Sequence, residues 1–120
     1  MRFRWSVAAT VTALAALPAS APAATSFDGV WSVVIITEKG TCDRAYRYPV
    51  RVQNGKVMYG GEASFNVSGQ VDARGRVRVS IRRGEQGASA SGRLSQSEGA
   101  GSWKSFAGEC AGNWTAERRS

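Results

Sequence analysis

The chain contains no histidine, only two cysteines, and no apolar run approaching the ~20 residues that a membrane-spanning helix needs. Without histidine, it cannot build a histidine-based catalytic triad, a histidine-ligated zinc site or a haem with an axial histidine. Acidic residues are also few, because nine Asp and Glu stand against sixteen Lys and Arg, for a net charge of +7. A hydrophobic share of 42% is too high for a disordered chain. These features leave a small, basic, globular protein.

The first 23 residues have the pattern of an export signal. Arg2 and Arg4 precede an uncharged apolar segment, which leads to a small-x-small cleavage site ending at Ala23. We therefore predict that residues 1–23 are a cleaved signal peptide and that 24–120 form a single all-β domain. The expected location is exported, either periplasmic or extracellular, with no membrane span.

Cys42 and Cys110 are the only cysteines and allow one intramolecular pairing. An oxidising compartment favours a disulfide between them. The alternatives are a metal site, which lacks further ligands, and a reactive thiol, which export disfavours. The bridge would close a loop of about 69 residues and contribute roughly 4 kcal/mol of stability in the chain-entropy model.

Apolar and polar residues alternate with a period of two between turn signals, which predicts β-strands. In the clearest case, Val77, Val79 and Ile81 share one face and arginines occupy the other. Asn54-Gly55 predicts a hairpin because both residues tolerate the positive φ of a type I′ turn. No segment has helical spacing, and glycine recurs too often for long helices. The strand spacing predicts a small antiparallel meander barrel of seven or eight strands, with a β-sandwich as the alternative.

The two ends of the predicted domain have similar sequences, since 29–33 (GVWSV) and 112–116 (GNWTA) share a glycine, a tryptophan and a hydroxyl residue. If the first and last strands are neighbours, Trp31 and Trp114 enter one core, and the disulfide joins the opening hairpin to the closing one. Closure would remove exposed strand edges. An eight-stranded barrel has an interior that holds side chains or one small ligand.

Three segments, 27–31 (FDGVW), 101–103 (GSW) and 110–114 (CAGNW), resemble small secreted bacterial all-β domains of uncharacterised function. The resemblance covers most of the predicted domain. It implies export and a β-rich fold, and it implies no catalytic residues. The opening tripeptide Gly29-Val30-Trp31 is also similar to that of avidin- and lipocalin-type barrels, over these three residues only, and it transfers no ligand.

Nothing in the sequence nominates an active site. Serine is abundant, but no base accompanies it, because histidine is absent and no lysine lies in a Ser-x-x-Lys arrangement. The nine acidic residues are scattered through predicted turns and strand ends, so no pair suggests glycosidase chemistry. We expect no catalytic residue, no metal and no cofactor.

The main functional candidate is a basic surface. Arginines alternate with valines on one predicted strand, and others lie on the polar faces of further strands. If these strands are neighbours, their guanidinium groups form a patch suited to phosphate or carboxylate. The alternative is an ordinary charged face that keeps the strands unpaired. The candidate anion-binding residues are Arg47, Arg51, Arg74, Arg76, Arg78, Arg82 and Arg93.

The predicted function is therefore a non-catalytic binding or envelope-associated module whose partner is an anionic envelope component or an acidic protein. Nucleic acid is not expected, because no aromatic residue accompanies the arginines for base stacking. One alternative is a secreted protease inhibitor, for which the loop 38–44 (EKGTCDR), braced by Cys42, is the best candidate.

The other alternative is a barrel that binds a small ligand. We expect the aromatic residues to fill so small an interior; if a cavity exists, Trp31, Trp103 and Trp114 should line it. The aromatic residues expected inside are Phe27, Trp31, Tyr46, Tyr48, Tyr59, Phe65, Trp103, Phe106 and Trp114.

Overall fold

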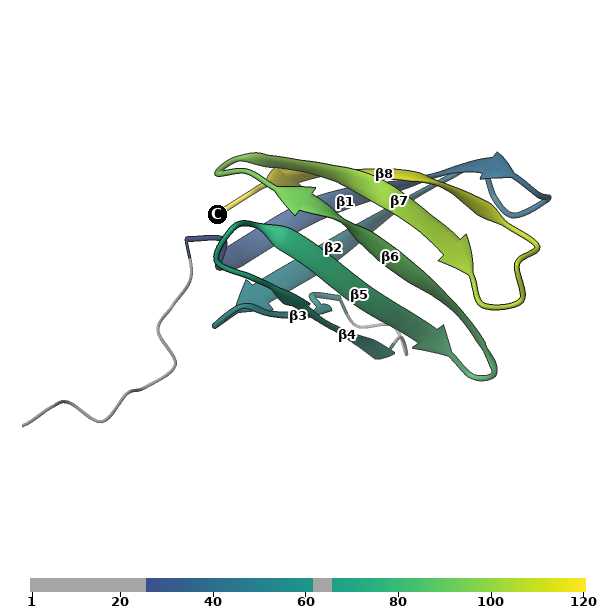
Figure 1. The fold of residues 1–120 in the computed structure, drawn as a ribbon, viewed down its shortest axis with the longest axis horizontal. Helices are drawn as coiled ribbons and strands as arrows, with labels where there is room; N and C mark the ends of the chain where they lie inside the picture. The colour runs from purple at the N-terminus through teal and green to yellow at the C-terminus, as the bar shows by residue number, and fades with distance from the viewer. Residues whose placement is uncertain (1–25, 62–65) are drawn as a thin grey trace, which may run out of the picture.

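Eight antiparallel strands close into a barrel in the computed structural model, which describes residues 26–61 and 66–120 (Figure 1). Each strand pairs with the next along the chain, and β8 pairs back with β1. This confirms the predicted all-β meander barrel and excludes the β-sandwich. The strands are β1 Gly29–Lys39, β2 Ala45–Gln53, β3 Lys56–Tyr59, β4 Asn66–Val71, β5 Arg76–Arg83, β6 Gln86–Leu94, β7 Glu98–Ser105 and β8 Ala111–Arg118.

Two sequence predictions fall outside the described residues. They are the signal peptide over 1–23 and the inward position of Phe65. No helix in the described part of the chain has the length and apolarity needed to cross a membrane.

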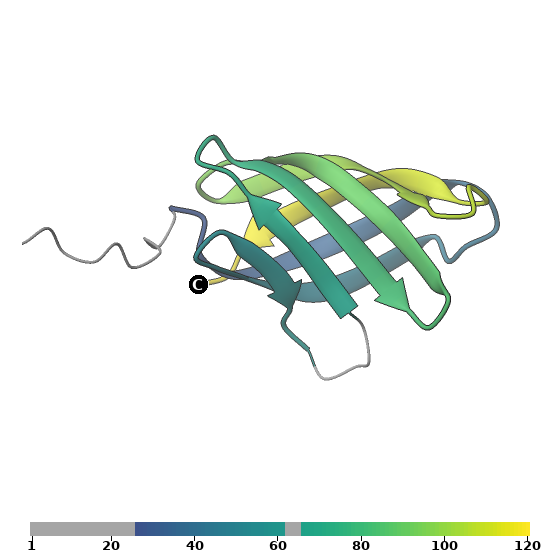
Figure 2. The same ribbon diagram turned by 60° about the horizontal axis from the view of Figure 1, so that its bottom comes forward.

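The predicted alternation holds along the strands. On β5, Val77 is buried and Val79 and Ile81 also face the interior, whereas Arg76, Arg78 and Arg82 are exposed. The strands curve around a single interior (Figure 2), and the buried apolar residues that pack there come from all eight strands.

The hairpin between β2 and β3 has the predicted turn. Asn54 and Gly55 both have positive φ, 54° and 77°. The Asp28 carboxylate accepts hydrogen bonds from the backbone N–H groups of Asn54, at 2.8 Å, and Gly55, at 3.2 Å. The turn is therefore fixed to the residues that precede β1.

One end of the barrel is closed by large side chains. Phe27, Trp31 and Leu94 are buried there, and the Trp31 Nε1–H donates to the Phe27 carbonyl at 2.9 Å. The Arg118 guanidinium lies 4.9 Å from the centroid of the Trp31 ring. The start of β1 and the last residues of the chain lie at this end, where the Arg119 N–H donates to the Val30 carbonyl.

The disulfide lies at the opposite end. Cys42 and Cys110 are bonded, as predicted, with their Cα atoms 6.2 Å apart. Cys110 is fully buried. The bridge joins the loop after β1 to the turn before β8, so it ties the first hairpin to the last.

Phe106 does not lie in the interior, contrary to the prediction. It follows β7 and is 46% exposed. Its ring lies beneath the Arg82 guanidinium, whose central carbon is 4.8 Å from the ring centroid. The residue belongs to a turn, where the alternation of a strand no longer determines which way a side chain points.

Candidate ligand cavity

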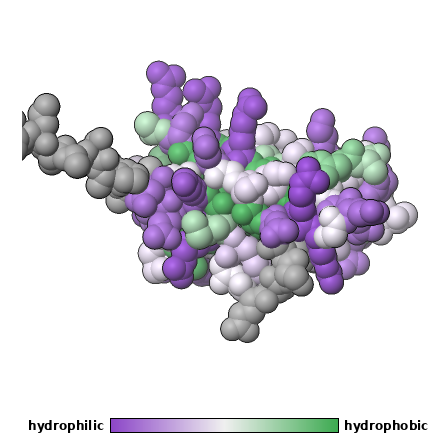
Figure 3. Space-filling model, turned by 90° about the horizontal axis from the view of Figure 1, so that it is seen from below, coloured by the Kyte–Doolittle hydropathy of each residue, from purple (hydrophilic) through white to green (hydrophobic). Residues whose placement is uncertain are grey.

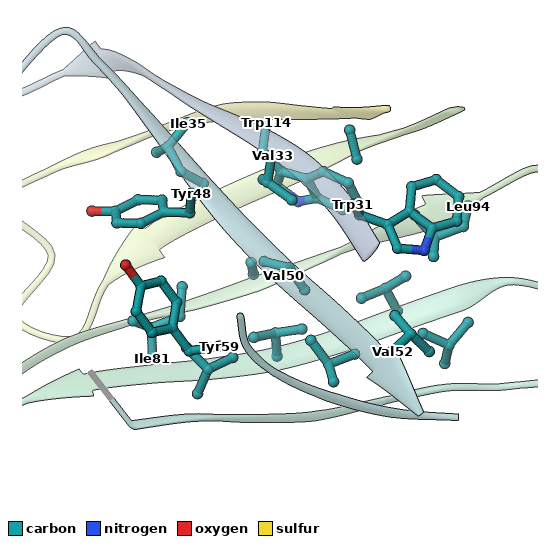
Figure 4. Close-up of a pocket in the computed structure, with 17 residues that line it drawn as sticks. Trp31, Val33, Ile35, Tyr48, Val50, Val52, Tyr59, Ile81, Leu94 and Trp114 are labelled. Carbon is teal, nitrogen blue, oxygen red and sulfur yellow. The ribbon is translucent and has the colours of Figure 1, made fainter. Parts of the chain in front are cut away.

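The barrel interior is incompletely filled and contains a cavity of about 80 Å³ (Figure 4). That volume is several times the roughly 10–15 Å³ that one water molecule requires. None of the lining residues is charged, and their only polar side-chain atoms are the tyrosine hydroxyls and the tryptophan N–H groups. The cavity is lined by Trp31, Val33, Ile35, Tyr48, Val50, Val52, Val57, Tyr59, Val67, Val71, Val77, Val79, Ile81, Ala90, Leu94, Trp114 and Ala116.

The two ends of the cavity differ. Trp31 and Leu94 are buried at one end, whereas Tyr48, Tyr59 and Ile81 remain partly exposed. Figure 4 shows the hydroxyl oxygens of Tyr48 and Tyr59 at the same end of the cavity, far from Trp31 and Leu94. The cavity is therefore closed by the Trp31 end of the barrel and open on the tyrosine side.

Three tyrosines from β2 and β3 gather at the open end. The rings of Tyr46 and Tyr48 stack with centroids 5.7 Å apart, and Tyr59 meets Tyr48 edge-on at 6.3 Å. Burial raises the pKa of Tyr48 above its ordinary value, and the neighbouring phenols Tyr46 and Tyr59 raise it further, while Arg83 acts in the opposite direction. The raised pKa keeps the Tyr48 hydroxyl neutral at ordinary pH, and a neutral phenol hydroxyl can both donate and accept a hydrogen bond.

The cavity persists because Trp114 lies against the wall of the barrel. A Cβ atom on Gly92 would lie 2.5 Å from the Trp114 ring, and one on Gly101 would lie 2.6 Å from its Nε1 atom. The Trp114 Nε1–H donates to the Ser91 carbonyl at 3.1 Å, which fixes the ring against β6. Because glycines let the ring approach the backbone this closely, it leaves the centre of the barrel open. Ala90 adds little volume there.

The three predicted aromatic residues occupy two kinds of position. Trp31 and Trp114 line the cavity. Trp103 is buried but is not a lining residue, and its Nε1–H donates to the Ile36 carbonyl at 3.0 Å. Sequence reasoning did not assign Tyr48 or Tyr59 to a cavity, since it placed all aromatic residues in a filled core. The sequence signal that could have indicated a cavity was the set of small residues at inward positions of β6 and β7.

The seven predicted arginines do not form one patch. Arg47 and Arg51 are on β2, which pairs with β1 and β3 and not with β5. Arg47 instead donates to the Ser32 hydroxyl on β1, at 2.8 Å. The condition that these strands be neighbours is therefore not met for β2.

The arginines of β5 and β6 are adjacent, but several are already engaged. Arg76 lies directly opposite Arg93 and forms an ion pair with Asp72 at 3.0 Å. The hydrogen bonds from the Arg76 and Arg74 backbone N–H groups, together with the Arg76 side chain, lower the pKa of the Asp72 carboxyl group, which stays ionised.

Arg82 contacts Phe106, and Arg74 lies exposed in the turn before β5. Arg78 is exposed and forms no ion pair with another described residue.

The loop considered for protease inhibition is held close to β1. The Thr37 hydroxyl donates to the Asp43 carbonyl at 2.6 Å, and the Thr37 N–H donates to the Arg44 carbonyl at 2.9 Å. Together with the disulfide at Cys42, these bonds restrain both sides of the loop.

Comparison with protein-family models, with curated proteins and with solved structures found no match.

Proposed function

We propose that the protein is a non-catalytic binding protein that holds a small apolar ligand inside its barrel. The cavity lined by aliphatic and aromatic side chains is the observation that carries this proposal. A water molecule needs two to four polar partners to be stable in a cavity, and the valine-rich walls supply none. An apolar ligand would instead gain about 25 cal/mol for each Å² removed from water.

The shape of the cavity supports a short aliphatic chain or a small ring. Its closed end is built from Trp31, Val52 and Leu94, which offer only apolar contact apart from an indole N–H already bonded to Phe27. Its open end carries the Tyr48 and Tyr59 hydroxyls, which suit a ligand with a polar end. The dispersal of the arginines over β2, β5 and β6 makes a single anionic surface partner the weaker candidate.

The disulfide is compatible with an oxidising, exported compartment. We place the binding function there, in the periplasm or outside the cell, on the strength of the signal-peptide pattern in residues 1–23.

Titration with 1-octanol tests the proposal. Trp31 and Trp114 line the cavity, so binding should change tryptophan emission, with a Kd in the range of about 10–100 μM for a ligand of this size. Ala90→Phe should fill the cavity and weaken octanol binding at least tenfold. Ala100→Phe is the matched control, because Ala100 faces outward on the adjacent strand β7, and it should bind octanol as the wild type does.

A milder variant covers the case in which Ala90→Phe does not fold. Val50→Leu adds one methylene to the cavity wall and should weaken binding by a smaller factor with the fold intact. Absence of octanol binding to the wild-type protein would overturn the proposal. So would unchanged binding in a folded Ala90→Phe protein.

A further inference from the structure

Strand β5 brings an arginine to the open end of the cavity. Three alternate residues of β5 line the cavity, namely Val77, Val79 and Ile81. Arg83 follows at the same spacing and is the last residue of the strand. It lies opposite Gln86 in the register with β6, beside the turn that joins the two strands. Because side chains two positions apart on a strand lie on the same face, Arg83 belongs to the cavity face of β5, one step beyond Ile81.

The charge of Arg83 acts on a hydroxyl of the same opening. Tyr48 lies on β2, which β3 and β4 separate from β5 around the wall of the barrel. Burial raises the pKa of Tyr48 most, and the phenols of Tyr46 and Tyr59 raise it further, whereas the Arg83 guanidinium lowers it. Asp43 also raises this pKa, but its effect is smaller than that of Arg83. The charge of Arg83 is therefore felt across the opening and outweighs that of Asp43 at the Tyr48 hydroxyl.

The opening also carries hydrogen-bond donors. The hydroxyls of Tyr48 and Tyr59 lie at the same end of the cavity (Figure 4), and the two rings meet edge-on with centroids 6.3 Å apart. A phenol hydroxyl can donate to a carboxylate oxygen, and a guanidinium can donate to both oxygens at once. A carboxylate at the open end would therefore meet donors of both kinds, while the valine-rich walls of the cavity offer apolar contact to the rest of the ligand.

We propose that the ligand is a single-chain amphiphile with a carboxylate head, bound with its chain inward. The aliphatic chain occupies the barrel cavity, and the carboxylate lies at the open end, between Arg83 and the hydroxyls of Tyr48 and Tyr59. One arginine on the cavity face matches the single negative charge of such a head group. This inference rests on the proposed function, because it assigns a head group to the ligand whose apolar part the cavity takes.

A general attraction of anions to the basic surface is the alternative to be separated from this contact. The chain has a net charge of +7, and Figure 3 shows hydrophilic side chains spread along the face seen from below, with apolar atoms near its centre. Arg82 supplies the matched control, because it precedes Arg83 and lies on the outer face, over the ring of Phe106. Both arginines are exposed. Replacing either one changes the net charge equally, but only Arg83 is on the cavity face.

Octanoate and 1-octanol test the head group, because they have the same number of carbon atoms and octanoate is ionised at pH 7. The quantity measured is the selectivity, defined as the Kd of octanol divided by the Kd of octanoate, with both followed by tryptophan emission. Arg83→Gln should lower the selectivity about three- to tenfold, as expected for one partly screened charge-assisted contact, and leave the Kd of octanol unchanged. Arg82→Gln should leave both quantities unchanged.

A second measurement uses the wild-type protein alone, so it does not depend on how well a variant folds. Octylamine has the same chain and the opposite charge at pH 7. Octanoate should bind more tightly than octylamine, and equal or tighter binding of octylamine would overturn the carboxylate assignment. In the variants, an unchanged Kd for octanol verifies that the barrel is folded.

The outcomes separate the head group from the proposed function. If octanol binds but Arg83→Gln keeps the wild-type selectivity, or if Arg82→Gln lowers the selectivity equally, the carboxylate assignment is wrong and the apolar binding function stands. If octanol does not bind the wild-type protein, the proposed function fails and this inference fails with it.

Discussion

The Tyr48 side chain supplies both an apolar ring for the cavity wall and a polar hydroxyl at the open end of the cavity. Its ring forms part of the apolar cavity wall, between Val50 and the stacked ring of Tyr46. Its hydroxyl lies at the open end of the cavity with that of Tyr59 (Figure 4). A phenylalanine could line the cavity equally well, so the hydroxyls at this end are the part of the lining that can select a ligand with a polar end.

The raised pKa of Tyr48 predicts a loss of stability at alkaline pH. A phenol whose pKa is raised by burial favours folding while it is protonated, so its contribution is complete below the ordinary pKa of 10.0 and is lost as pH rises toward the folded-state pKa. The free energy of unfolding should therefore fall above pH 10, and it should fall less steeply in Tyr48→Phe. Urea denaturation at pH 8 and at several points above pH 10 measures both slopes.

Tyr46 also has a raised pKa, chiefly through burial and with Asp43 adding to it, so Tyr48→Phe should keep part of the alkaline slope. An identical slope in the variant and the wild type would mean that Tyr48 does not contribute to the loss of stability above pH 10.

At the scale of elements, β6 and β7 form the thin wall against which Trp114 lies. A Cβ atom on Gly101 would be 2.0 Å from the Ser91 carbonyl oxygen and 2.6 Å from Trp114 Nε1. Gly101→Ala must therefore move the β6–β7 pairing or push Trp114 toward the cavity. We expect a loss of about 1–3 kcal/mol in the free energy of unfolding and weaker octanol binding.

Gly60→Ala is the matched control for this substitution. A Cβ atom on Gly60 would be 3.4 Å from the Pro49 backbone, which is an ordinary contact. Urea denaturation of both variants makes the comparison, and a Gly101→Ala protein as stable as Gly60→Ala would contradict this description of the wall.

The strands were predictable because their signals are local. Alternation placed Val77, Val79 and Ile81 inside, and Asn54-Gly55 marked a turn that the positive φ angles confirm. The cavity was not predictable in the same way, because it depends on how a ring from β8 lies over glycines of β6 and β7. No local pattern encodes that contact.

The arrangement of the arginines also could not be predicted from local sequence patterns. Alternation placed Arg47 and Arg78 outside, but only the order of strands around the closed barrel shows that β2 and β5 are separated by β3 and β4. Two other arginines have partners that come from turns. Arg76 pairs with Asp72, and Arg82 lies over the ring of Phe106.

For the whole molecule, the disulfide is the main covalent constraint on the barrel. Cys42 and Cys110 are separated by 68 positions and join the first hairpin to the last. In the chain-entropy model, a loop of this length contributes about 4 kcal/mol. The Cys42→Ser/Cys110→Ser protein should lose stability of that order, measured as the shift of the urea midpoint relative to the wild type.

Treatment of the wild-type protein with dithiothreitol should reproduce the same shift. The double variant should be insensitive to the reductant, which serves as the internal control. A midpoint that does not change on reduction would show that the barrel is stable without the bridge.

The position of Ser120 has a practical consequence. The last residues of the chain are bonded to Val30, beside Phe27 and Trp31, at the end of the barrel that these side chains close. A reporter or an immobilisation tag joined after Ser120 would therefore leave from the side of the molecule away from the tyrosine hydroxyls. Biosensor formats that anchor the protein by this residue would keep the opening directed toward the sample.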